Sequence, residues 1–423
     1  MEIYKFGGAS VRDAEAVRNV LRVIRDTADS VPGTKKVVVV SAMGKTTNAL
    51  EAIHRARYNR QDVRPLVEEV KAYHQQIADD LFGNNESAKK PMYDMLEAMT
   101  EQVQEPLSGD FDRDYDQLVC YGELVSTAIV NGFLAESGIK TGWVDARMVI
   151  RTDQRFRDAR VDWNRSAQGV LQLLQVLDKK ELAVTQGFIG SGGLGVSTTL
   201  GREGSDFTAA ILAYLLDARS VTIWKDVPGM LNADPKLFPD AVMLPSVSYH
   251  EAIELAYYGA SVIHPKTVKP LQNKNIPLYI RSFVNPALPG TVIHADGTHD
   301  ADVASYIYKR DQVLISVSTR DFSFVVEDNL RDLFDIFASL GIRIHLMENS
   351  AISFSVVTDN DPYKRDKLFA ALSLHYSVRY NEGLSLLTIR HYTEALLAKH
   401  LEGREVMLEQ RSRHTVRLVI KEA

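Results

Sequence analysis

The sequence predicts an α/β protein in which a mostly parallel sheet, layered with helices, is followed by a smaller α+β region. Two observations predict this division. Strands rich in β-branched residues alternate with amphipathic helices over residues 1–295. After a segment rich in Pro, Gly, Asp and His, the expected elements take an order that is typical of antiparallel sheets.

The first elements show the alternation clearly. Residues 2–6 form a short apolar run that ends in Gly7-Gly8, and residues 14–28 place apolar side chains at helical spacing. Residues 36–41 (KVVVVS) are almost entirely β-branched, which predicts a strand buried on both faces. Such strands are typical of parallel sheets that helices cover on both sides.

The rest of the first region continues in the same way. A polar, helix-rich stretch over residues 47–105 predicts an α-hairpin inserted on the sheet. Further helices are expected over residues 118–137, 206–216 and 250–258, and further strands over residues 141–145, 182–189, 220–225 and 277–282. We therefore predict one layered domain over residues 1–295.

The second region has a different pattern. Composition shifts over residues 285–302, and we place the interdomain linker at residues 296–304. Beyond it we expect a strand over 305–318, a helix over 329–340, a hairpin over 342–358, a helix over 364–374 and a strand over 384–389. The order β-α-β-β-α-β is that of a ferredoxin-like unit.

Composition excludes several classes of protein. The 423 residues carry 49 Lys+Arg against 55 Asp+Glu, so bulk charge does not favour nucleic-acid binding. One cysteine, Cys120, cannot form an intrachain disulfide, and the longest uniform apolar run is too short to cross a membrane. These features predict a cytoplasmic protein with neither a nucleic-acid nor a membrane partner.

Three familiar patterns fail on their context. The sequence Gly44-Lys45-Thr46 follows a strand, but the opening glycine of a phosphate-binding P-loop is replaced by Val39. The G-x-G-x-x-G pattern at 190–195 is followed by a β-branched segment where a dinucleotide-binding fold needs a helix. A zinc-binding H-E-x-x-H beginning at 250 lacks its second histidine, so we predict no protein metal site.

A glycine-rich turn is the first polar segment that fits a ligand site. Lys5 and the pair Gly7-Gly8 lie where a strand leads toward a helix, and Ser10 follows. Glycines let backbone N–H groups approach an anion, and a helix N-terminus adds positive potential. A tight turn with a solvated Lys5 explains the same residues, so both interpretations stay open at this point.

The second segment is Gly201-Arg202-Glu203-Gly204-Ser205-Asp206 before a helix. The planar guanidinium of Arg202 suits a carboxylate, and Asp206 could fix a lysine or a metal. Alternatively, Ser205 or Asp206 is simply the N-cap of the helix.

Two further segments carry charged groups near predicted element ends. Lys225 and Asp226 close a strand before a Pro-Gly turn, where ligands bind in open α/β sheets, and Lys266 ends a helical stretch. Glu123 is expected at the start of a helix, either as a first-turn residue or as a partner for a substrate ammonium. For each residue a purely structural role remains the alternative.

Six motifs in this order resemble the aspartate kinases of the amino-acid kinase superfamily. They are K-F-G-G-A-S, V-V-V-V-S-A-M-G-K-T-T-N, Y-G-E-L-V-S, T-L-G-R-E-G-S-D-F-T-A-A, I-W-K-D-V-P-G-M-L-N-A-D-P and G-A-S-V-I-H-P-K-T. The resemblance covers almost the whole chain. It implies phosphorylation of the side-chain carboxylate of L-aspartate by ATP with Mg²⁺, the first step of lysine, threonine and methionine biosynthesis.

The resemblance also implies roles for individual residues. Lys5 and Asp206 are the implied catalytic residues, since phosphoryl transfer depends on positioning and charge neutralisation. The implied aspartate-binding set is Ser41, Thr47, Glu123, Arg202 and Ser205. The implied nucleotide-binding set is Lys5, Gly7, Gly8, Ser10, Lys225, Asp226, Lys236 and Lys266.

The C-terminal region resembles the paired ACT domains of these enzymes, which sense end-product amino acids. We expect one complete unit at residues 313–382 inserted in a second, shortened unit made of 305–312 and 383–423. Because ferredoxin-like units often pair their sheets, the resemblance implies a homodimer through these units and an amino-acid effector.

Three positions depart from the family pattern. Glu203 replaces a common glycine, so its side chain must point away from the phosphates or pair with a base. Leu231 lies where many members have a tyrosine, which removes a stacking partner for adenine. His345 lies where lysine-sensitive members often have an aspartate, which predicts weak or altered inhibition by lysine.

Two other functions compete with this one. One keeps the chemistry but changes the acceptor to glutamate, N-acetylglutamate or another carboxylate. The other is a non-catalytic amino-acid sensor on an inactive kinase scaffold, against which the intact Lys5, Arg202 and Asp206 weigh.

Overall fold

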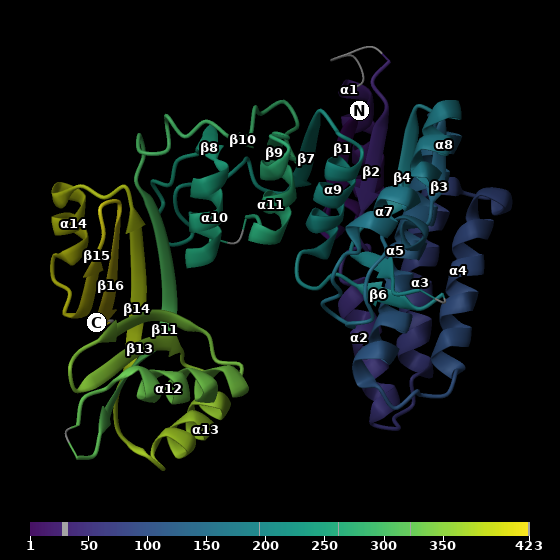
Figure 1. Ribbon diagram of the computed structural model, residues 1–423. Coiled ribbons are helices and arrows are strands. Elements are labelled where there is room, and N and C mark those ends of the chain that lie inside the picture. The colour runs from purple at the N-terminus through teal and green to yellow at the C-terminus, as the bar shows by residue number, and fades with distance from the viewer. Residues whose placement is uncertain (28–32, 194, 261, 322, 422–423) are drawn as a thin grey trace. The chain divides into compact units, whose positions relative to one another are not determined.

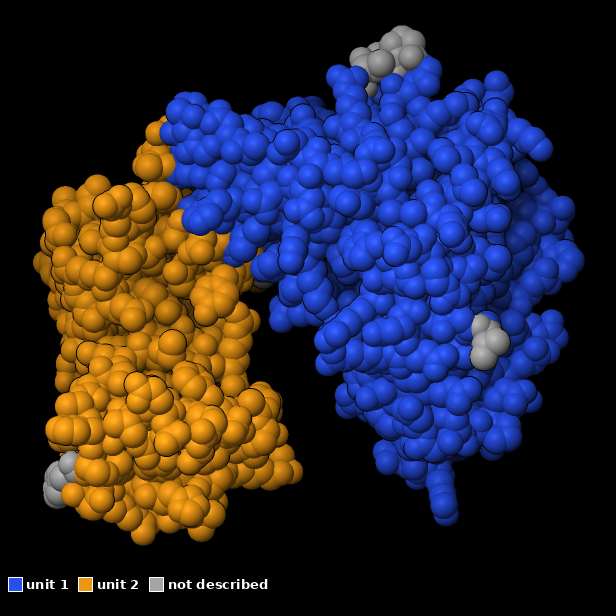
Figure 2. All heavy atoms as spheres, viewed as in Figure 1, with its two compact units in different colours: residues 1–230, 243–253, 261–300 blue, residues 231–242, 254–260, 301–423 orange. Residues whose placement is uncertain are grey.

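The computed structural model describes residues 1–27, 33–193, 195–260, 262–321 and 323–421 (Figure 1). Within it the chain forms two compact units, which Figure 2 shows in different colours. Unit 1 comprises residues 1–230, 243–253 and 261–300, and unit 2 comprises residues 231–242, 254–260 and 301–423.

Unit 1 is built on an eight-stranded sheet with the order β3-β4-β2-β1-β7-β9-β10-β8. Its strands are β1 (Glu2–Phe6), β2 (Lys36–Val40), β3 (Thr141–Val144), β4 (Leu182–Gln186), β7 (Ser220–Lys225), β8 (Ser246–Ser248), β9 (Leu278–Ser282) and β10 (Thr291–His294). Every neighbouring pair is parallel except β9 and β10. The predicted mostly parallel sheet is confirmed.

Helices and one small hairpin complete unit 1. The helices are η1 (Gly8–Val11), α1 (Ala14–Asp26), α2 (Thr46–Tyr58), α3 (Arg64–Phe82), α4 (Glu86–Gln104), α5 (Phe111–Glu136), α6 (Ala146–Val149), α7 (Trp163–Gly169), α8 (Leu171–Lys179), α9 (Gly204–Leu215), α11 (Pro265–Asn273) and the first half of α10 (Tyr249–Tyr258), whose residues 254–258 belong to unit 2. The hairpin consists of β5 (Ile189–Ser191) and β6 (Ser197–Thr199), which form a separate two-stranded sheet.

The alternation of side chains along β1 decides which face of the sheet Lys5 lies on. Tyr4 and Phe6 face a core that includes residues of α1, α3, α4 and α5. Because successive side chains of a strand point to opposite faces, Lys5 faces the other side together with Ile3. Helix α9, which carries Asp206, packs against β1 on that other side.

Helix α5 is 26 residues long and apolar enough to cross a membrane by length and composition. Most of its apolar window is buried inside the protein, as in the central helix of a folded core. It begins at Phe111, seven residues before the predicted start, because the side chain of Asp110 accepts hydrogen bonds from the N–H groups of Asp112 and Arg113. Glu123 therefore lies in the middle of a helix, and the first-turn interpretation of this residue is wrong.

Several other expectations need correction. Residues 47–105 form three helices, not a hairpin, because breaks at 59–63 and 83–85 interrupt the helical run twice. The segment 285–302 contains β10, which pairs with β8 through residues 292–294 and with β9 through residues 291–293. Helices α6, α7 and α8 were not predicted. His264 is the N-cap of α11, so Lys266 begins a helix where we expected it to end one.

Unit 2 contains a six-stranded antiparallel sheet with the order β12-β13-β11-β14-β16-β15. Its elements are β11 (Ser305–Thr319), α12 (Glu327–Ser339), β12 (Ile344–Asn349), β13 (Ser353–Asp359), α13 (Pro362–Leu372), β14 (Tyr376–Arg390), α14 (Glu394–Leu401), β15 (Val406–Arg411) and β16 (Thr415–Lys421). Strands β11 and β14 have 15 residues each and pair along almost their whole length.

The two long strands join two halves of unit 2. Their register shifts between Lys309 and Gln312, and Asp311 there has a left-handed φ of 53°. On one side of the shift, β11 pairs with β13 and β14, β13 pairs with β12, and α12 and α13 lie between these strands in the chain, which gives the predicted β-α-β-β-α-β order. On the other side they belong with α14, β15 and β16. Helix α14 and the length of β14 were not predicted.

Candidate active site

A cavity of about 530 Å³ opens in unit 1 where the carboxyl ends of β1, β2 and β7 meet. Parallel strands bring these ends to the same edge of the sheet, where ligands bind in open α/β folds. The residues that line it are Lys5, Gly8, Ser41, Ala42, Gly44, Thr47, Asn48, Glu51, Tyr115, Glu123, Arg157, Phe188, Thr199, Gly201, Arg202, Glu203, Gly204, Ser205, Asp206 and Lys225.

Two lysines and one aspartate form the buried centre of the cavity. The ammonium of Lys5 lies 2.6 Å from Asp206 Oδ1, and that of Lys225 lies 3.3 Å from Asp206 Oδ2. Lys5 is 8% exposed and Asp206 is 2% exposed, so the solvated alternative for Lys5 is wrong. Burial opposes ionisation of Asp206, but the two lysines lower the pKa of this carboxyl below its usual value. The centre thus holds two cations against one anion and suits an anionic ligand.

The glycine turn after β1 comes close to the segment after β2. A Cβ atom at Gly8 would lie 2.8 Å from the carbonyl oxygen of Ala42 and 3.0 Å from that of Gly44. Only glycine fits this approach without a shift of backbone. The turn therefore leaves backbone beside Lys5 without a side chain to block it.

Glu123 reaches the cavity from α5 and is 2% exposed. Its Oε1 accepts a hydrogen bond from the backbone N–H of Ala42 at 3.4 Å, while Oε2 is buried without a hydrogen-bond partner among the described residues. Burial raises the pKa of this carboxyl to about 8. A cation entering the cavity would find in Glu123 an acceptor with no competing partner.

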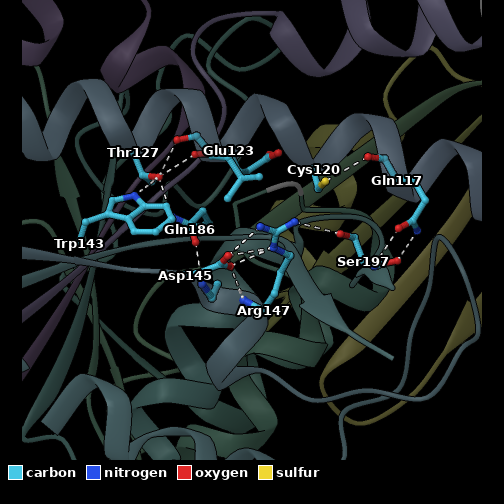
Figure 3. Close-up of polar contacts among 11 residues, drawn as sticks. Gln117, Cys120, Glu123, Thr127, Trp143, Asp145, Arg147, Gln186 and Ser197 are labelled. Atoms are coloured by element: carbon cyan, nitrogen blue, oxygen red, sulfur yellow. Dashed lines mark hydrogen bonds and ion pairs between the residues drawn. The ribbon is translucent and has the colours of Figure 1, made fainter. Parts of the chain in front are cut away.

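A close helix contact and a hydrogen-bonded network fix α5 behind Glu123. A Cβ at Gly122 would lie 3.1 Å from the Cβ of Ala42, so glycine lets the helix approach this segment. Figure 3 shows the network: the hydroxyl of Thr127 donates to the carbonyl of Glu123 and accepts from Trp143 and Gln186. The acceptor Glu123 is thus held on a rigid support.

The same view shows Cys120 beside an ion pair of Arg147 with Asp145 (Figure 3). Cys120 is 1% exposed, and burial raises the pKa of its thiol to about 11. A protonated, buried thiol is unreactive, so Cys120 is a core residue of α5.

The turn that opens α9 supplies the other wall of the cavity. Its N-cap is Glu203, so Ser205 and Asp206 lie in the first helical turn and neither is the cap. Glu203 has a left-handed φ of 53°, and its side chain lines the cavity. Its Oε2 is buried and, within the described chain, has no hydrogen-bond partner. We expected this side chain to point away from the phosphates or to pair with a base. Burial lowers the pKa of His264, and the charge of Glu203 opposes that shift, so Glu203 acts on a base although its Oε2 forms no hydrogen bond to it.

Five predicted site residues lie outside the lining of this cavity: Gly7, Ser10, Asp226, Lys236 and Lys266. The hydroxyl of Ser10 donates to the carbonyl of Trp224 at 3.5 Å. The ammonium of Lys266 forms an ion pair with Asp158. Lys236 is an exposed residue of unit 2.

Sequence reasoning missed several residues of the lining, among them Glu51, Tyr115, Arg157 and Thr199. Glu51, Tyr115 and Arg157 lie outside the six motifs, and Thr199 is the first residue of one of them but was given no role. Glu51 follows Thr47 by one turn of α2, and this helical spacing is the only sequence signal that points to it.

A second cavity, of about 720 Å³, lies at the opposite ends of β1, β7 and β9. Its lining includes three prolines and two tyrosines, and its charged members are Glu2, Asp26, Arg219 and Arg281. Among the described residues no ion pair joins these four, in contrast to the two lysines that contact Asp206, so we place the candidate active site in the smaller cavity.

Residues 1–282 match the model of the Amino acid kinase family. Lysine-sensitive aspartokinase 3 of Escherichia coli (strain K12) is 31% identical over 395 residues, which cover 92% of this chain and 86% of that protein. The chain belongs to the aspartokinases of the amino acid kinase family. The resemblance stated from the motifs is confirmed.

Solved structures of aspartokinase III from E. coli extend the likeness over the whole chain. One holds lysine and aspartate in the T-state and aligns with a TM-score of 0.83 at 28% identity, covering 100% of this chain and 96% of that chain. Another holds aspartate and ADP in the R-state and aligns with a TM-score of 0.80, with the same identity and coverage. The aspartokinase fold thus extends through both units.

Proposed function

We propose that the chain transfers the γ-phosphoryl group of ATP to the side-chain carboxylate of L-aspartate and releases ADP and 4-phospho-L-aspartate. The observation that carries this proposal is the buried group of Lys5, Asp206 and Lys225 in the cavity of an aspartokinase fold. The reaction places the negative charge of a phosphoryl group between the leaving ADP and the acceptor carboxylate of aspartate. The buried ammonium of Lys5 and the partly exposed ammonium of Lys225 are suited to stabilise that charge.

The acceptor needs little further activation. A carboxylate is already ionised near neutral pH, so the site requires positioning and charge neutralisation more than a general base. We assign Lys5 to the transferring phosphoryl group, while Asp206 holds Lys5 and Lys225 in place. Lys225 is further fixed by a hydrogen bond from its ammonium to the carbonyl of Val262.

The remaining polar groups of the lining divide between the two substrates. For aspartate we propose Ser41, Thr47, Glu123, Arg202 and Ser205, with the ammonium at Glu123. For the nucleotide we propose Lys5, Gly7, Gly8, Ser10, Lys225, Asp226, Lys236 and Lys266, by the family resemblance.

Mg²⁺ is expected to accompany ATP and to neutralise charge on its phosphates. No group of three or more His, Cys, Asp or Glu able to hold a metal occurs among the described residues. The free Oε2 of Glu203 fits a single carboxylate contact to a cation that the nucleotide brings. We propose no further protein ligand.

For the whole protein we propose a cytoplasmic homodimer formed through C-terminal ACT units, with residues 313–382 as one unit and residues 305–312 and 383–423 as the other. An amino acid is the proposed effector. The continuous sheet of unit 2 supports this division, since the register shift between Lys309 and Gln312 separates the two halves.

A coupled assay of ADP release tests the proposed reaction. Wild type with ATP, Mg²⁺ and aspartate is expected to turn over. Lys5→Ala should lower kcat by a factor on the order of 10³, since it removes a positive charge that stabilises the transition state of phosphoryl transfer. Lys140→Ala, which removes a lysine that is 73% exposed, is the matched control and should keep full activity. Turnover with glutamate or N-acetylglutamate but not with aspartate would show that the enzyme acts on a different carboxylate. ATP binding without any turnover would show that the protein is a non-catalytic sensor on an inactive kinase scaffold.

A further inference from the structure

Three residues that line the cavity have left-handed backbone angles although none is glycine. φ is 64° at Arg157, 70° at Phe188 and 53° at Glu203. The conformation costs a residue with a Cβ about 1–2 kcal/mol, so it persists where the surrounding structure enforces it. Arg157 is the cationic member of the three, and no function considered so far uses it.

The backbone of Arg157 is fixed by Asp116 of α5, which is completely buried. Asp116 Oδ2 accepts from the backbone N–H of Arg157 at 3.0 Å and from that of Thr199 at 2.8 Å. Asp116 Oδ1 accepts from the Thr199 hydroxyl at 2.7 Å. One carboxylate thereby ties two lining segments to α5 and holds Arg157 at a set position on the wall.

The Arg157 turn also lies against the turn that carries Arg202. A Cβ at Gly201 would be 3.1 Å from the carbonyl oxygen of Arg157 and 2.9 Å from Asp158 Oδ1. Glycine at 201 allows this approach, so the backbones of the two arginine-bearing turns are in contact. Both guanidinium-bearing residues line the same cavity.

The guanidinium of Arg157 is positioned but not saturated. It stacks on Tyr115, with Cζ 4.3 Å from the ring centroid, and it donates to Asp112 Oδ1 at 3.3 Å. Its ion pair with Glu51 Oε1, at 3.9 Å, is too long for a hydrogen bond. Because a guanidinium has five N–H donors, Arg157 retains donors for a ligand.

We propose that Arg157, together with Arg202, binds the α-carboxylate of the amino-acid substrate. The proposal rests on the proposed function. Its partners on α2 and α5 point to the amino-acid side of the cavity: Glu51 lies one turn after Thr47, and Tyr115 lies two turns before Glu123. With the acceptor carboxylate at Lys5 and the ammonium at Glu123, the α-carboxylate is the remaining anionic group of aspartate. Paired guanidinium groups suit a charged carboxylate and discriminate against a neutral amide there.

Arg157→Gly tests the proposal because glycine accepts the left-handed backbone while the guanidinium is lost. We expect the KM for aspartate to rise about tenfold or more, the effect of one charge-assisted hydrogen bond, with the KM for ATP unchanged. The preference for aspartate over L-aspartic acid α-amide, measured as a ratio of kcat/KM, should fall by a similar factor. Arg157→Lys keeps the charge but not the planar guanidinium, so its KM for aspartate should lie between the values of wild type and Arg157→Gly.

Arg60→Gly is the matched control. Arg60 is an exposed arginine with a φ of 56° that does not line the cavity, so its replacement relieves the same backbone strain at a distance. Its kinetic constants should equal those of wild type, and thermal unfolding should show both glycine variants folded.

The outcomes separate the two proposals. An active wild type with an unchanged aspartate KM in Arg157→Gly overturns the role of Arg157 alone. A rise in the KM for ATP in place of that for aspartate also overturns it, since the arginine would then serve the nucleotide. A folded wild type without aspartate-dependent ADP release overturns the proposed function and this inference together.

Discussion

At the scale of single residues, the least compensated group of the cavity is the carboxyl of Glu123. Burial raises its pKa from 4.5 to about 8, so the free protein holds this carboxyl largely protonated at neutral pH. A substrate ammonium favours the ionised form and lowers that pKa. Aspartate binding near pH 7 is therefore expected to release a proton.

The first prediction concerns pH. Since the ionised carboxylate binds the ammonium, affinity for aspartate should increase as pH rises from about 6 to about 8 and then level off. Glu123→Gln should weaken aspartate binding at least about tenfold and abolish this pH dependence. Calorimetry in two buffers of different ionisation enthalpy measures the released proton; equal heats for wild type would contradict the assignment.

The same shift predicts the stability of the free protein. Between about pH 4.5 and pH 8 the folded state holds a proton at Glu123 that the unfolded chain has lost. The contribution of this residue to stability therefore falls as pH rises through that window. In urea titrations, the free energy of unfolding should fall less between pH 5 and pH 8 in Glu123→Gln than in wild type. An identical fall in the two proteins would refute this prediction.

Glu203 is a second residue whose local conformation is unfavourable. Its left-handed φ of 53° and buried, unpartnered Oε2 both oppose folding. We predict that Glu203→Gly raises the free energy of unfolding by about 1 kcal/mol. Asn275→Gly, at a φ of 52° with no charge, measures the backbone effect alone. Destabilisation by Glu203→Gly in denaturant titrations would show that its carboxylate has a partner in the folded protein.

At the scale of elements, α5 is the helix on which the cavity depends. Three of its side chains position the lining. Asp116 fixes the turn at Arg157, Glu123 contacts the segment after β2 and is the proposed ammonium site, and Thr127 accepts a hydrogen bond from Gln186 of β4. The helix works as a rigid support because its ends and inner face are fixed by hydrogen bonds and packing.

A substitution at Asp116 tests this support. Asp116→Asn keeps the volume of the side chain but replaces one acceptor oxygen with an amide NH₂. Loss of the charge weakens the hydrogen bonds that Oδ2 accepts from the backbone N–H groups of Arg157 and Thr199, and an NH₂ at the position of Oδ2 would remove their acceptor, so the strained 157 turn should relax. We expect the KM for aspartate to rise several-fold, as for loss of one buried hydrogen bond, with secondary structure in circular dichroism unchanged. A KM equal to that of wild type would show that Arg157 keeps its place without the clamp.

Elements also mark what sequence could and could not predict. Strands β1 and β2 were predicted because their apolar runs are uninterrupted, and Lys5 and Asp206 because they stand at motif positions beside such elements. Helices α6, α7 and α8 are short, with four, seven and nine residues, so their periodicity is too brief to recognise. Arg157 was missed because its position depends on Asp116, 41 residues earlier in the chain. Contacts of that separation leave no local pattern.

At the scale of the whole molecule, the question is which amino acid regulates the enzyme. In unit 2, the ring of buried His345 lies 3.3 Å from the ammonium of Lys309 and 2.9 Å from Asp359. Burial, followed by Lys309, lowers the pKa of His345, which keeps the imidazole neutral. A neutral ring beside an existing ammonium offers little attraction to another ammonium.

A prediction on lysine inhibition follows from this arrangement. Lysine at millimolar concentration should inhibit this enzyme weakly, unlike its lysine-sensitive relative. Separate titrations of lysine, threonine and methionine in the ADP-release assay test this, and strong inhibition by lysine would contradict it. His345→Asp, which restores an anion at this position, is expected to increase whatever lysine inhibition exists.

The two long strands of unit 2 have a consequence for modular exchange. Because β11 and β14 each run through both halves without an intervening loop, neither half has strand ends of its own at the register shift. A chimera in which one half is replaced by the regulatory domain of another enzyme would require a cut within both β11 and β14, where the two strands are hydrogen-bonded to each other. New ligand specificities for this protein are therefore to be sought by changing side chains within the sheet, since there is no seam along which a foreign module can be joined.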